Sequence, residues 1–542
     1  MAATFPAGSS AVNGAGQTRA RASDSLAVLS NAGGPGDTCE SSPGLISTVR
    51  LHNDMKLTRA AGILLHPTSL PGPNGIGELG DDAYRFLDFL AEVGITIWQV
   101  LPLGPTGYGD SPYQTFSAFA GNPLLIATGS DAHEFPAHTV DFERVMRYKR
   151  SLLDRAIAAY QPDDRYREFV ASHADWLDEY ALFMALKQAH GGAAWTDWDR
   201  GAASRDPDAL ARWRERLAET YERYRIEQYF FYRQFDALGT AAAGRGIKIM
   251  GDLPIYVAHD SADVWADRAA FKLHPDGRPI VVAGVPPDYF SATGQLWGNP
   301  IYDWDAMRAN GYAWWIRRLR AAFELYDIIR IDHFRGFEAY WEVPGGEPTA
   351  VNGRWVKGPG AELFDAVTKA LGRLPIVAEN LGVITPAVEA MREQFGYPGM
   401  SILQFAFGVD PEAGEFRPHN FPRARVVYTG THDNDTTIGW WASTGEGDST
   451  RASAEVAREK QFALQYLGAD GREMNWTLIR AALASVANTV IIPMQDVLGL
   501  GSEARMNLPG RASGNWRFRF SWDQLTRDTI ERLRALVRIY DR

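Results

Sequence analysis

The sequence predicts an α/β protein, a (β/α)8 TIM barrel with large insertions after its strands. Three observations favour this fold: short apolar runs alternate with helical segments, eight such runs occur, and three of them are closely followed by an acidic residue. A chain of 542 residues, 45% of them hydrophobic, is long enough to bury so large a core. A doubly wound open sheet is the alternative that the same alternation permits.

The eight predicted strands are short runs of apolar and β-branched residues. They are Gly62 to Leu65, Ile97 to Leu101, Ile247 to Met250, Ile328 to Ile331, Ile376 to Ala378, Ile402 to Phe405, Val426 to Tyr428 and Val490 to Ile492. Between the first two, apolar residues recur at helical spacing, at Ala83, Phe86, Leu87 and Leu90, and Gly94 is placed where a helix would stop. This is a βαβ unit, and its repetition predicts a parallel sheet.

Two gaps between predicted strands are too long for simple crossovers, and they indicate insertions. Residues 121–238 contain amphipathic helices such as DWLDEYALFMALKQAH and predict a mostly helical insertion. Residues 258–310 are rich in Gly, Pro and aromatic residues and predict a second insertion built of loops. Long loops after barrel strands usually build the substrate cleft. With these two insertions included, the catalytic barrel is expected to span residues 55–542.

The first 54 residues are rich in Ala, Gly and Ser and are predicted to form a disordered extension. Their scattered charges leave three alternatives open: a disordered tail, an organelle transit peptide, or translated upstream sequence with Met55 as the functional start. We expect a cytoplasmic protein, or a plastid protein if this segment is a transit peptide. The single cysteine, Cys39, excludes an intrachain disulfide.

The composition narrows the class of partner. A net charge of −11 disfavours a nucleic acid or an anionic membrane surface, because both require a basic stripe. No stretch approaches 18 consecutive apolar residues, so no membrane span is expected. The 17 Trp and 21 Tyr residues suit the stacking of sugar faces, and a neutral substrate is favoured. The oligomeric state is left open.

Three carboxylates at the ends of three strands suggest glycosidic-bond chemistry: Asp332 in DIIRIDHFRGF, Glu379 in LPIVAENLG and Asp433 in RVVYTGTHDNDT. Retaining cleavage needs a carboxylate nucleophile and a carboxylic acid about 5 Å apart. Asp332 is the predicted nucleophile, because Arg330, two residues earlier, points to the same side of the strand and keeps a nearby carboxylate ionised.

Glu379 is the predicted general acid and base. Its strand is apolar, and an apolar setting together with a neighbouring negative charge raises the pKa of a carboxyl group. His432 and Asp433 are predicted to hydrogen-bond the hydroxyls of the distorted sugar, and Asp433 favours the positive charge of the transition state.

Other interpretations of these residues stay open at this point. An acidic residue after a strand is often a helix N-cap, so only the joint occurrence of three carries weight. HDND is also compatible with a metal cluster through His432, Asp433 and Asp435, but no second histidine stands beside it at ligand spacing, and no metal is expected. Arg330 is compatible with a purely structural ion pair.

Several long segments closely resemble the amylomaltases, the 4-α-glucanotransferases of glycoside hydrolase family 77. They run in order from about Met55 to the C-terminus and read GILLHPTSLPG, WQVLPLGPTGYGDSPYQTFSAFAGNP, GDLPIYVAHDSADVW, PPDYFSATGQLWGNPIYDW, RIDHFRGF, VAENLG, GTHDNDT and EARMNLPGRASGNW. The resemblance implies an enzyme of the α-amylase clan that moves α-1,4-glucan segments between chains, without a metal or organic cofactor. Its implied substrates are α-1,4-glucans, maltooligosaccharides and glucose.

Carried over residue by residue, the resemblance agrees with the roles argued above for Asp332, Glu379 and Asp433. It adds sugar-binding residues from six segments. Those implied to contact the donor sugar are Tyr113, Asp252, Arg330 and His432; Gln295 and Trp297 belong to a flexible loop over the acceptor sugars, and Asn507 is a further candidate.

Four of these residues also have a structural interpretation when their segments are read alone. Tyr113 and Trp297 are then core or packing residues, Asp252 is a carboxylate that stabilises a loop or the barrel, and Asn507 has a conformational role before a Leu-Pro turn.

Transfer and hydrolysis use the same three carboxylates, since either a sugar hydroxyl or water can attack the glycosyl-enzyme ester. An aromatic segment, Pro286 to Trp304, is expected to exclude water and stack an acceptor. The resemblance alone makes transfer the favoured hypothesis. The alternatives are an α-amylase-like retaining hydrolase and a glucan-binding protein without activity.

Overall fold

The computed structural model describes residues 57–131, 133–287, 293–445, 452–511 and 513–542. The chain divides into two compact units, Met1–Pro43 and Gly44–Arg542, and every described residue belongs to the second. The predicted extension at residues 1–54, with Cys39 in it, therefore lies outside the described residues. No described helix has both the length and the apolar character that a membrane crossing requires.

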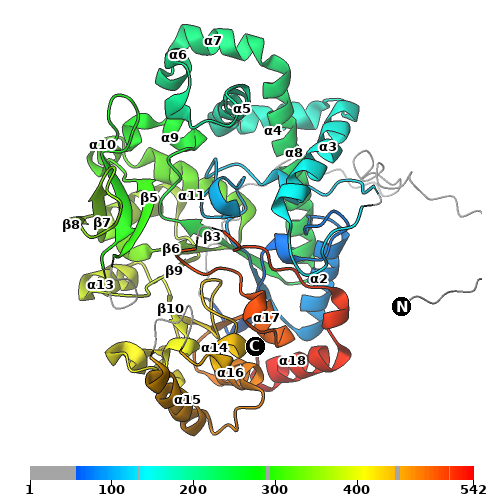
Figure 1. Ribbon diagram of the computed structural model, residues 1–542, viewed down its shortest axis with the longest axis vertical. Helices are drawn as coiled ribbons and strands as arrows, with labels where there is room; N and C mark the ends of the chain where they lie inside the picture. Colours follow the sequence, from blue (N-terminus) through cyan, green and yellow to red (C-terminus); the bar gives the residue numbers. More distant parts are fainter. Residues whose placement is uncertain (1–56, 132, 288–292, 446–451, 512) are drawn as a thin grey trace, which may run out of the picture. The chain divides into compact units, whose positions relative to one another are not determined.

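Eight parallel strands form the central sheet, in the order β10-β11-β12-β1-β2-β3-β6-β9. Their bounds are β1 Ala60–Leu64, β2 Ile97–Gln99, β3 Lys248–Pro254, β6 Ile328–Asp332, β9 Ile376–Ala378, β10 Gly399–Ile402, β11 Arg425–Tyr428 and β12 Thr489–Pro493. The first strand pairs with both the second and the last, which wraps the sheet around on itself. This confirms the predicted (β/α)8 barrel; Figure 1 shows several of its strands at the centre of the molecule.

The barrel closes between β9 and β10 through few contacts. The N–H of Ala378 donates to the carbonyl of Pro398 at 2.9 Å, and the Asn380 side chain accepts from the N–H of Met400 at 2.8 Å. A Cβ at Gly399 would lie 2.4 Å from Nη1 of Arg425 and 2.6 Å from Oδ1 of Asn380. A glycine at this position therefore permits the close approach at the seam.

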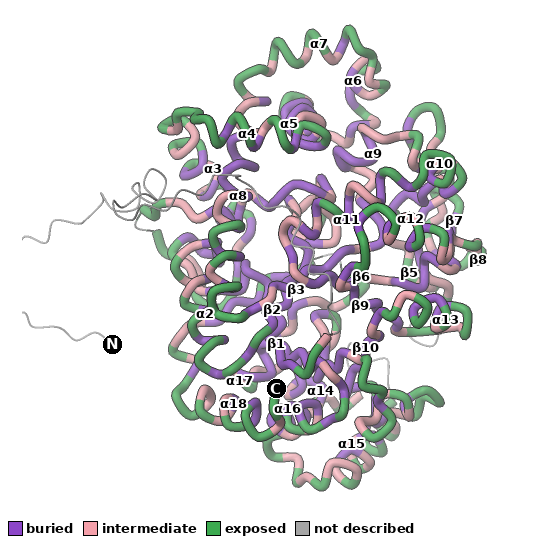
Figure 2. Tube along the Cα trace, turned by 180° about the vertical axis from the view of Figure 1, so that it is seen from behind, coloured by how far each residue is buried: buried purple, intermediate pink, exposed green. Residues whose placement is uncertain are grey.

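The helix α2 (Asp81–Val93) packs its predicted apolar face onto the barrel, and Ala83, Phe86, Leu87 and Leu90 are all buried. Gly94 ends the helix in the left-handed conformation, with φ of 82°, and its N–H donates to carbonyls of the last turn. The predicted βαβ unit is confirmed. Figure 2 shows strands β1, β2 and β3 within the buried interior.

Further helices follow the third barrel strand in the sequence. They are α9 Ala262–Ala266, α10 Trp304–Ala309, α11 Ala313–Leu325, α12 Ala361–Leu371, α13 Pro386–Gln394, α14 Thr437–Ala442, α15 Ser453–Leu467, α16 Met474–Ala484, α17 Met494–Leu498 and α18 Arg527–Ile539. Of these, α11, α16 and α17 contact barrel strands, whereas α9 packs on the helix α5 (Ala174–Ala189) of the insertion.

In the sequence, a group of helices lies between β2 and β3. They are α3 Phe142–Ala159, α4 Asp164–Ser172, α5 Ala174–Ala189, α6 Arg200–Ser204, α7 Pro207–Arg216 and α8 Ala218–Gly244. The last of these leads directly into β3 and doubles as a barrel helix, so it continues past the predicted boundary at residue 238. Figure 1 shows α5, α6 and α7 of this group at the top of the molecule. The domain boundaries themselves stay a prediction.

A second, four-stranded antiparallel sheet is present that the sequence did not indicate. Its order is β5-β4-β7-β8, with β4 Val281–Val285, β5 Gln295–Pro300, β7 Ala339–Pro344 and β8 Arg354–Lys357. Two strands come from the second predicted insertion and two from the connection after β6. The strands that pair are far apart in the sequence, so no local sequence pattern predicts the pairing.

The sixth predicted strand is wrong in position. Ile402 to Phe405 was expected to be extended, but β10 covers Gly399–Ile402 and residues Leu403–Phe405 form a 3₁₀-helix. Its pairing with β11 runs from Gly399 opposite Arg425 to Ile402 opposite Tyr428. Gly399 and Ser401 lack apolar side chains, so the apolar pattern placed the strand too late. The other seven predicted strands overlap the observed ones.

Candidate active site

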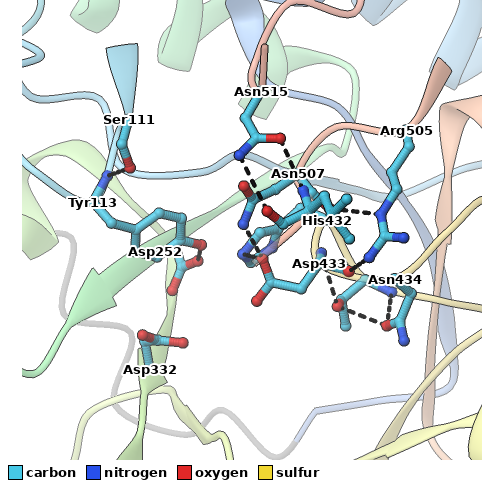
Figure 3. Close-up of polar contacts among 12 residues, drawn as sticks. Ser111, Tyr113, Asp252, Asp332, His432, Asp433, Asn434, Arg505, Asn507 and Asn515 are labelled. Carbon is cyan, nitrogen blue, oxygen red and sulfur yellow. Dashed lines mark hydrogen bonds and ion pairs between the residues drawn. The ribbon is translucent and has the colours of Figure 1, made fainter. Parts of the chain in front are cut away.

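The three predicted carboxylates lie at the C-terminal ends of their strands, which is where barrel enzymes place their chemistry. Asp332 is the last residue of β6, Glu379 follows β9 directly, and Asp433 lies in the loop after β11. Figure 3 shows Asp332 and Asp252 on one side of the site and Asp433 with His432 on the other.

Arg330 is the centre of the ionic contacts in the site. Its Nη1 lies 2.8 Å from both carboxylate oxygens of Asp252, and its Nη2 lies 2.8 Å from Oδ1 of Asp332. The β3–β6 register places Asp252 beside Arg330, which explains the first contact. The guanidinium is buried, so it interacts strongly with both carboxylates. Arg330 is thus a member of a structural ion pair and also a direct neighbour of Asp332.

Asp252 has a second partner in the hydroxyl of Tyr113, which donates to Oδ2 at 2.5 Å. Burial raises the pKa of Asp252, and the nearby Arg330 opposes this rise. Burial, followed by the charge of Asp252, holds the pKa of Tyr113 well above its usual range, so Tyr113 remains a neutral donor. Tyr113 and Asp252 therefore join the group of contacts that Arg330 makes with Asp332.

Glu379 has a carboxyl group suited to exchanging a proton near neutral pH. Burial raises its pKa to about 7, and the charge of Asp332 adds to that effect while Arg330 opposes it. Two backbone N–H groups fix the carboxyl group: Leu381 donates to Oε1 at 2.7 Å and His333 donates to Oε2 at 2.8 Å. His333 has a φ of 54°, a left-handed conformation that is costly for a residue with a side chain.

Asp433 is half-exposed and is held from the loop after β12. The side-chain amide of Asn507 donates to its Oδ1 at 2.6 Å, and Nη2 of Arg505 donates to its backbone carbonyl at 2.6 Å. The N–H of Asn507 also donates to the carbonyl of His432 at 3.0 Å. The two loops are therefore hydrogen-bonded together, and Asn507 has a direct contact with Asp433 beyond any conformational role (Figure 3).

Three aromatic side chains lie among these residues. Tyr113 stacks on His432 with a centroid separation of 5.1 Å, and Trp516 lies 5.7 Å from Tyr113 and 5.9 Å from His432. Sequence reasoning missed Trp516 and Arg505 as members of the site. Both stand in the segment EARMNLPGRASGNW, whose resemblance to the family was the signal that could have found them.

Gln295 and Trp297 are in β5, at the edge of the small antiparallel sheet. The indole N–H of Trp297 donates to Oε1 of Gln295 at 3.1 Å. The Trp297 ring meets His333 edge to face, with centroids 4.8 Å apart. The small sheet therefore places Trp297 against the residue that follows the predicted nucleophile in the chain. Part of the predicted acceptor segment, residues 288–292, lies outside the described residues.

Within the described part of the chain, no three His, Cys, Asp or Glu side chains are grouped so that they could hold a metal ion. Asp435, the third member of the HDND alternative, instead accepts a hydrogen bond from the Ser502 hydroxyl at 2.7 Å. The expectation that the reaction needs no metal or organic cofactor stays a prediction.

The comparisons with known proteins identify the family. A model of glycoside hydrolase family 77, described as 4-alpha-glucanotransferase, matches residues 65–526. The chain belongs to this family. It is 50% identical over 511 residues to the 4-alpha-glucanotransferase of Thermus thermophilus, covering 90% of this chain and 100% of that one. It is 49% identical over 507 residues to the 4-alpha-glucanotransferase of a Synechocystis strain, and this match covers 89% of this chain and 98% of the relative.

A solved family 77 structure agrees with the sequence relatives. The amylomaltase from Streptococcus agalactiae, in complex with acarbose, has a TM-score of 0.84 and 39% identity, and the match covers 89% of this chain and 99% of that one. These findings confirm the predicted family, the barrel fold and the enzyme class, a 4-α-glucanotransferase. The roles of the individual site residues stay predictions.

Proposed function

We propose that this family 77 enzyme cleaves an α-1,4-glucan with retention and passes the segment to the 4-hydroxyl of another glucan or of glucose, through a covalent bond to Asp332. The observation that supports this most directly is the contrast between two neighbouring carboxyl groups. Asp332 lies 2.8 Å from a buried guanidinium, whereas burial raises the pKa of Glu379 to about 7. One carboxylate is thereby suited to attack and the other to hold a proton.

In the first step, an Asp332 oxygen attacks the anomeric carbon of the donor sugar while the glycosidic bond breaks. Arg330 contacts Oδ1, so Oδ2 is the oxygen that forms the new bond. Glu379 gives its proton to the departing 4-oxygen, and the shortened glucan leaves with a restored hydroxyl group. The enzyme then holds a glycosyl ester on Asp332 and an ionised Glu379.

In the second step, ionised Glu379 accepts the proton of an incoming 4-hydroxyl, whose oxygen attacks the same anomeric carbon. The ester bond to Asp332 breaks, the new α-1,4 bond forms, and Glu379 is protonated again. When the incoming hydroxyl belongs to the same glucan chain, the product is a ring. Both displacements invert the anomeric carbon, so the overall result is retention.

Asp433 acts on the sugar during both steps. The Asn507 amide fixes its carboxylate, which hydrogen-bonds the sugar hydroxyls and stabilises the oxocarbenium-like charge. His432 and Tyr113 bind the same sugar, and Asp252 orients Tyr113 and Arg330. Malto-oligosaccharides and longer α-1,4-glucans are the proposed donors.

The proposed function is tested by incubating the enzyme with maltotriose and analysing the products. Glucose together with maltodextrins longer than maltotriose is the expected result, because transfer lengthens one chain as it shortens another. A mixture of glucose and maltose without longer chains would instead identify the hydrolase alternative. Binding of maltotriose without any products would identify a protein that only binds glucan.

The pH dependence follows from the carboxyl group of Glu379. Because it must be protonated to act first as an acid, kcat/KM for maltotriose should fall as the pH rises through about 7. The decline should approach tenfold for each further pH unit. Initial rates measured from pH 5 to 9 test this fall of kcat/KM on the alkaline side. A kcat/KM that stays constant up to pH 9 would contradict the assignment of the acid.

Trp297 is expected to favour transfer over hydrolysis, because it lies beside His333 and belongs to the segment expected to cover the acceptor sugars. The Trp297→Ala variant should therefore release more reducing ends per transfer event, by about threefold or more, as about 1 kcal/mol of stacking is lost. The ratio of hydrolysis to transfer on maltotriose measures this. A Trp213→Ala variant, in α7 of the helical group, serves as the control and should leave the ratio unchanged.

A further inference from the structure

Asp496 lies beneath the loop that carries His432 and Asp433. It is in α17, just after the last barrel strand, and only 1% of its surface is exposed. Its own backbone is held by the Asn475 side chain, which donates to the Asp496 carbonyl at 2.9 Å.

The Asp496 side chain bonds both ends of that loop. The Thr429 hydroxyl, just after β11, donates to Oδ2 at 2.5 Å. At the start of α14, the Thr437 backbone N–H donates to Oδ1 at 2.7 Å and the Thr437 hydroxyl donates to Oδ2 at 2.8 Å. One carboxylate therefore joins the end of a barrel strand to the start of the following helix, and the segment between them contains His432 and Asp433.

The middle of the loop is held by other elements. The Gln404 amide, after β10, donates to the carbonyl of Asp435 at 2.9 Å, and Ser502 donates to its carboxylate. Arg505 and Asn507 hold Asp433 itself. With its two ends joined through Asp496, the loop has little freedom left to move the Asp433 carboxylate.

Fold stability alone does not account for a carboxylate here. All three donors are uncharged, and a buried carboxylate loses the hydration that it has in the unfolded chain. Burial raises the pKa of Asp496, and the hydrogen bonds from Thr429 and Thr437 oppose that rise. An apolar residue of similar volume would avoid this cost, but it could not bond both ends of the loop.

We infer that Asp496 is a positioning residue: by bonding Thr429 and Thr437 it holds Asp433 where the transition-state charge develops. The inference rests on the proposed role of Asp433. Misplacing a catalytic group by about 1 Å can cost on the order of 100-fold in rate. The loss falls on kcat rather than KM, because the interaction with Asp433 strengthens in the transition state.

The Asp496→Asn variant provides the first test, with maltotriose as substrate. We expect kcat to fall by about 10- to 100-fold while KM changes less than about twofold. Thr437→Val keeps the backbone N–H but removes one bond, and its kcat should fall less. This milder variant keeps the inference testable if Asp496→Asn does not fold. A kcat within twofold of wild type in both variants would overturn the inference.

A double-mutant cycle separates positioning from general destabilisation. If Asp496 acts through Asp433, adding Asp496→Asn to an Asp433→Asn variant should change the already reduced kcat by less than about twofold. A full additional loss would show that Asp496 acts on something other than Asp433, and would overturn the inference. An α-maltosyl fluoride donor keeps the slow variants measurable.

Glu227→Gln is the matched control for loss of stability. Glu227 is a fully buried carboxylate in α8 that pairs with Arg150, within the helical group. This variant should lower the melting temperature but keep the wild-type kcat per folded molecule. If the wild-type enzyme itself fails to redistribute maltotriose, the proposed function has failed; if it does so and Asp496→Asn is equally fast, only the positioning inference has failed.

Discussion

Replacing Asp332 by asparagine is expected to lower the rate of maltotriose redistribution by on the order of 10⁴-fold or more. An amide cannot form the glycosyl ester, and it also removes the negative charge that Arg330 contacts at 2.8 Å. Asp252 continues to pair with Arg330 through both of its oxygens, so the guanidinium is not left unpaired. Product analysis over long incubations, together with a melting curve, measures the effect.

Asp305→Asn is a suitable control for this variant. Asp305 is an exposed carboxylate of α10 that pairs with the surface residue Arg308 in the same helix, so its loss should leave kcat unchanged. The Asp332→Asn variant should melt within a few degrees of the wild type. Redistribution at more than about one hundredth of the wild-type rate by a folded Asp332→Asn variant would rule out Asp332 as the nucleophile.

Replacing Glu379 by glutamine is expected to slow maltotriose turnover by about 10²- to 10⁴-fold. Glutamine cannot donate a proton to the leaving 4-oxygen. With α-maltosyl fluoride the first step needs no protonation, and the glycosyl enzyme should form and accumulate because no base activates the acceptor. Stopped reactions that separate the first turnover from later ones distinguish the two effects.

Azide provides the discriminating control for the Glu379→Gln variant. Azide attacks without the help of a base, so it should speed release of the accumulated intermediate and give a maltosyl azide of retained configuration. The alkaline limb near pH 7 should also vanish in this variant. If azide has no effect and the limb persists, Glu379 is not the acid and base.

Local sequence patterns predicted the barrel because the strands and the helix of each βαβ unit have apolar patterns that can be recognised within a short segment. The apolar face of α2 and its glycine stop at Gly94 illustrate this. The predicted position of the sixth strand was wrong, because β10 contains Gly399 and Ser401, which have no apolar side chains. Gly399 instead permits the close approach between strands where the barrel closes. The antiparallel sheet stayed unpredicted because its β4 and β7 pair across the whole of α10, α11 and β6.

For the site, as for the fold, local patterns could be predicted from the sequence and long-range contacts could not. Asp332, Glu379 and Asp433 were predicted because each follows a strand that the apolar pattern reveals. Their partners could not be predicted from spacing, since Asn507 reaches Asp433 from the loop after a different strand. Asp496 was missed for the same reason, because its bonds to Thr429 and Thr437 cross from one barrel strand to the next.

The proposed mechanism is tested most directly by locating the covalent bond between enzyme and sugar. The Glu379→Gln variant should be mixed with α-maltosyl fluoride, quenched in acid, digested and analysed by mass spectrometry. We predict that the peptide containing Asp332 gains the mass of one maltosyl unit, that fragmentation places the unit on Asp332, and that the gain is absent when Asp332→Asn is added. A maltosyl unit on another residue, or rapid turnover with every peptide unmodified, would contradict the proposed mechanism.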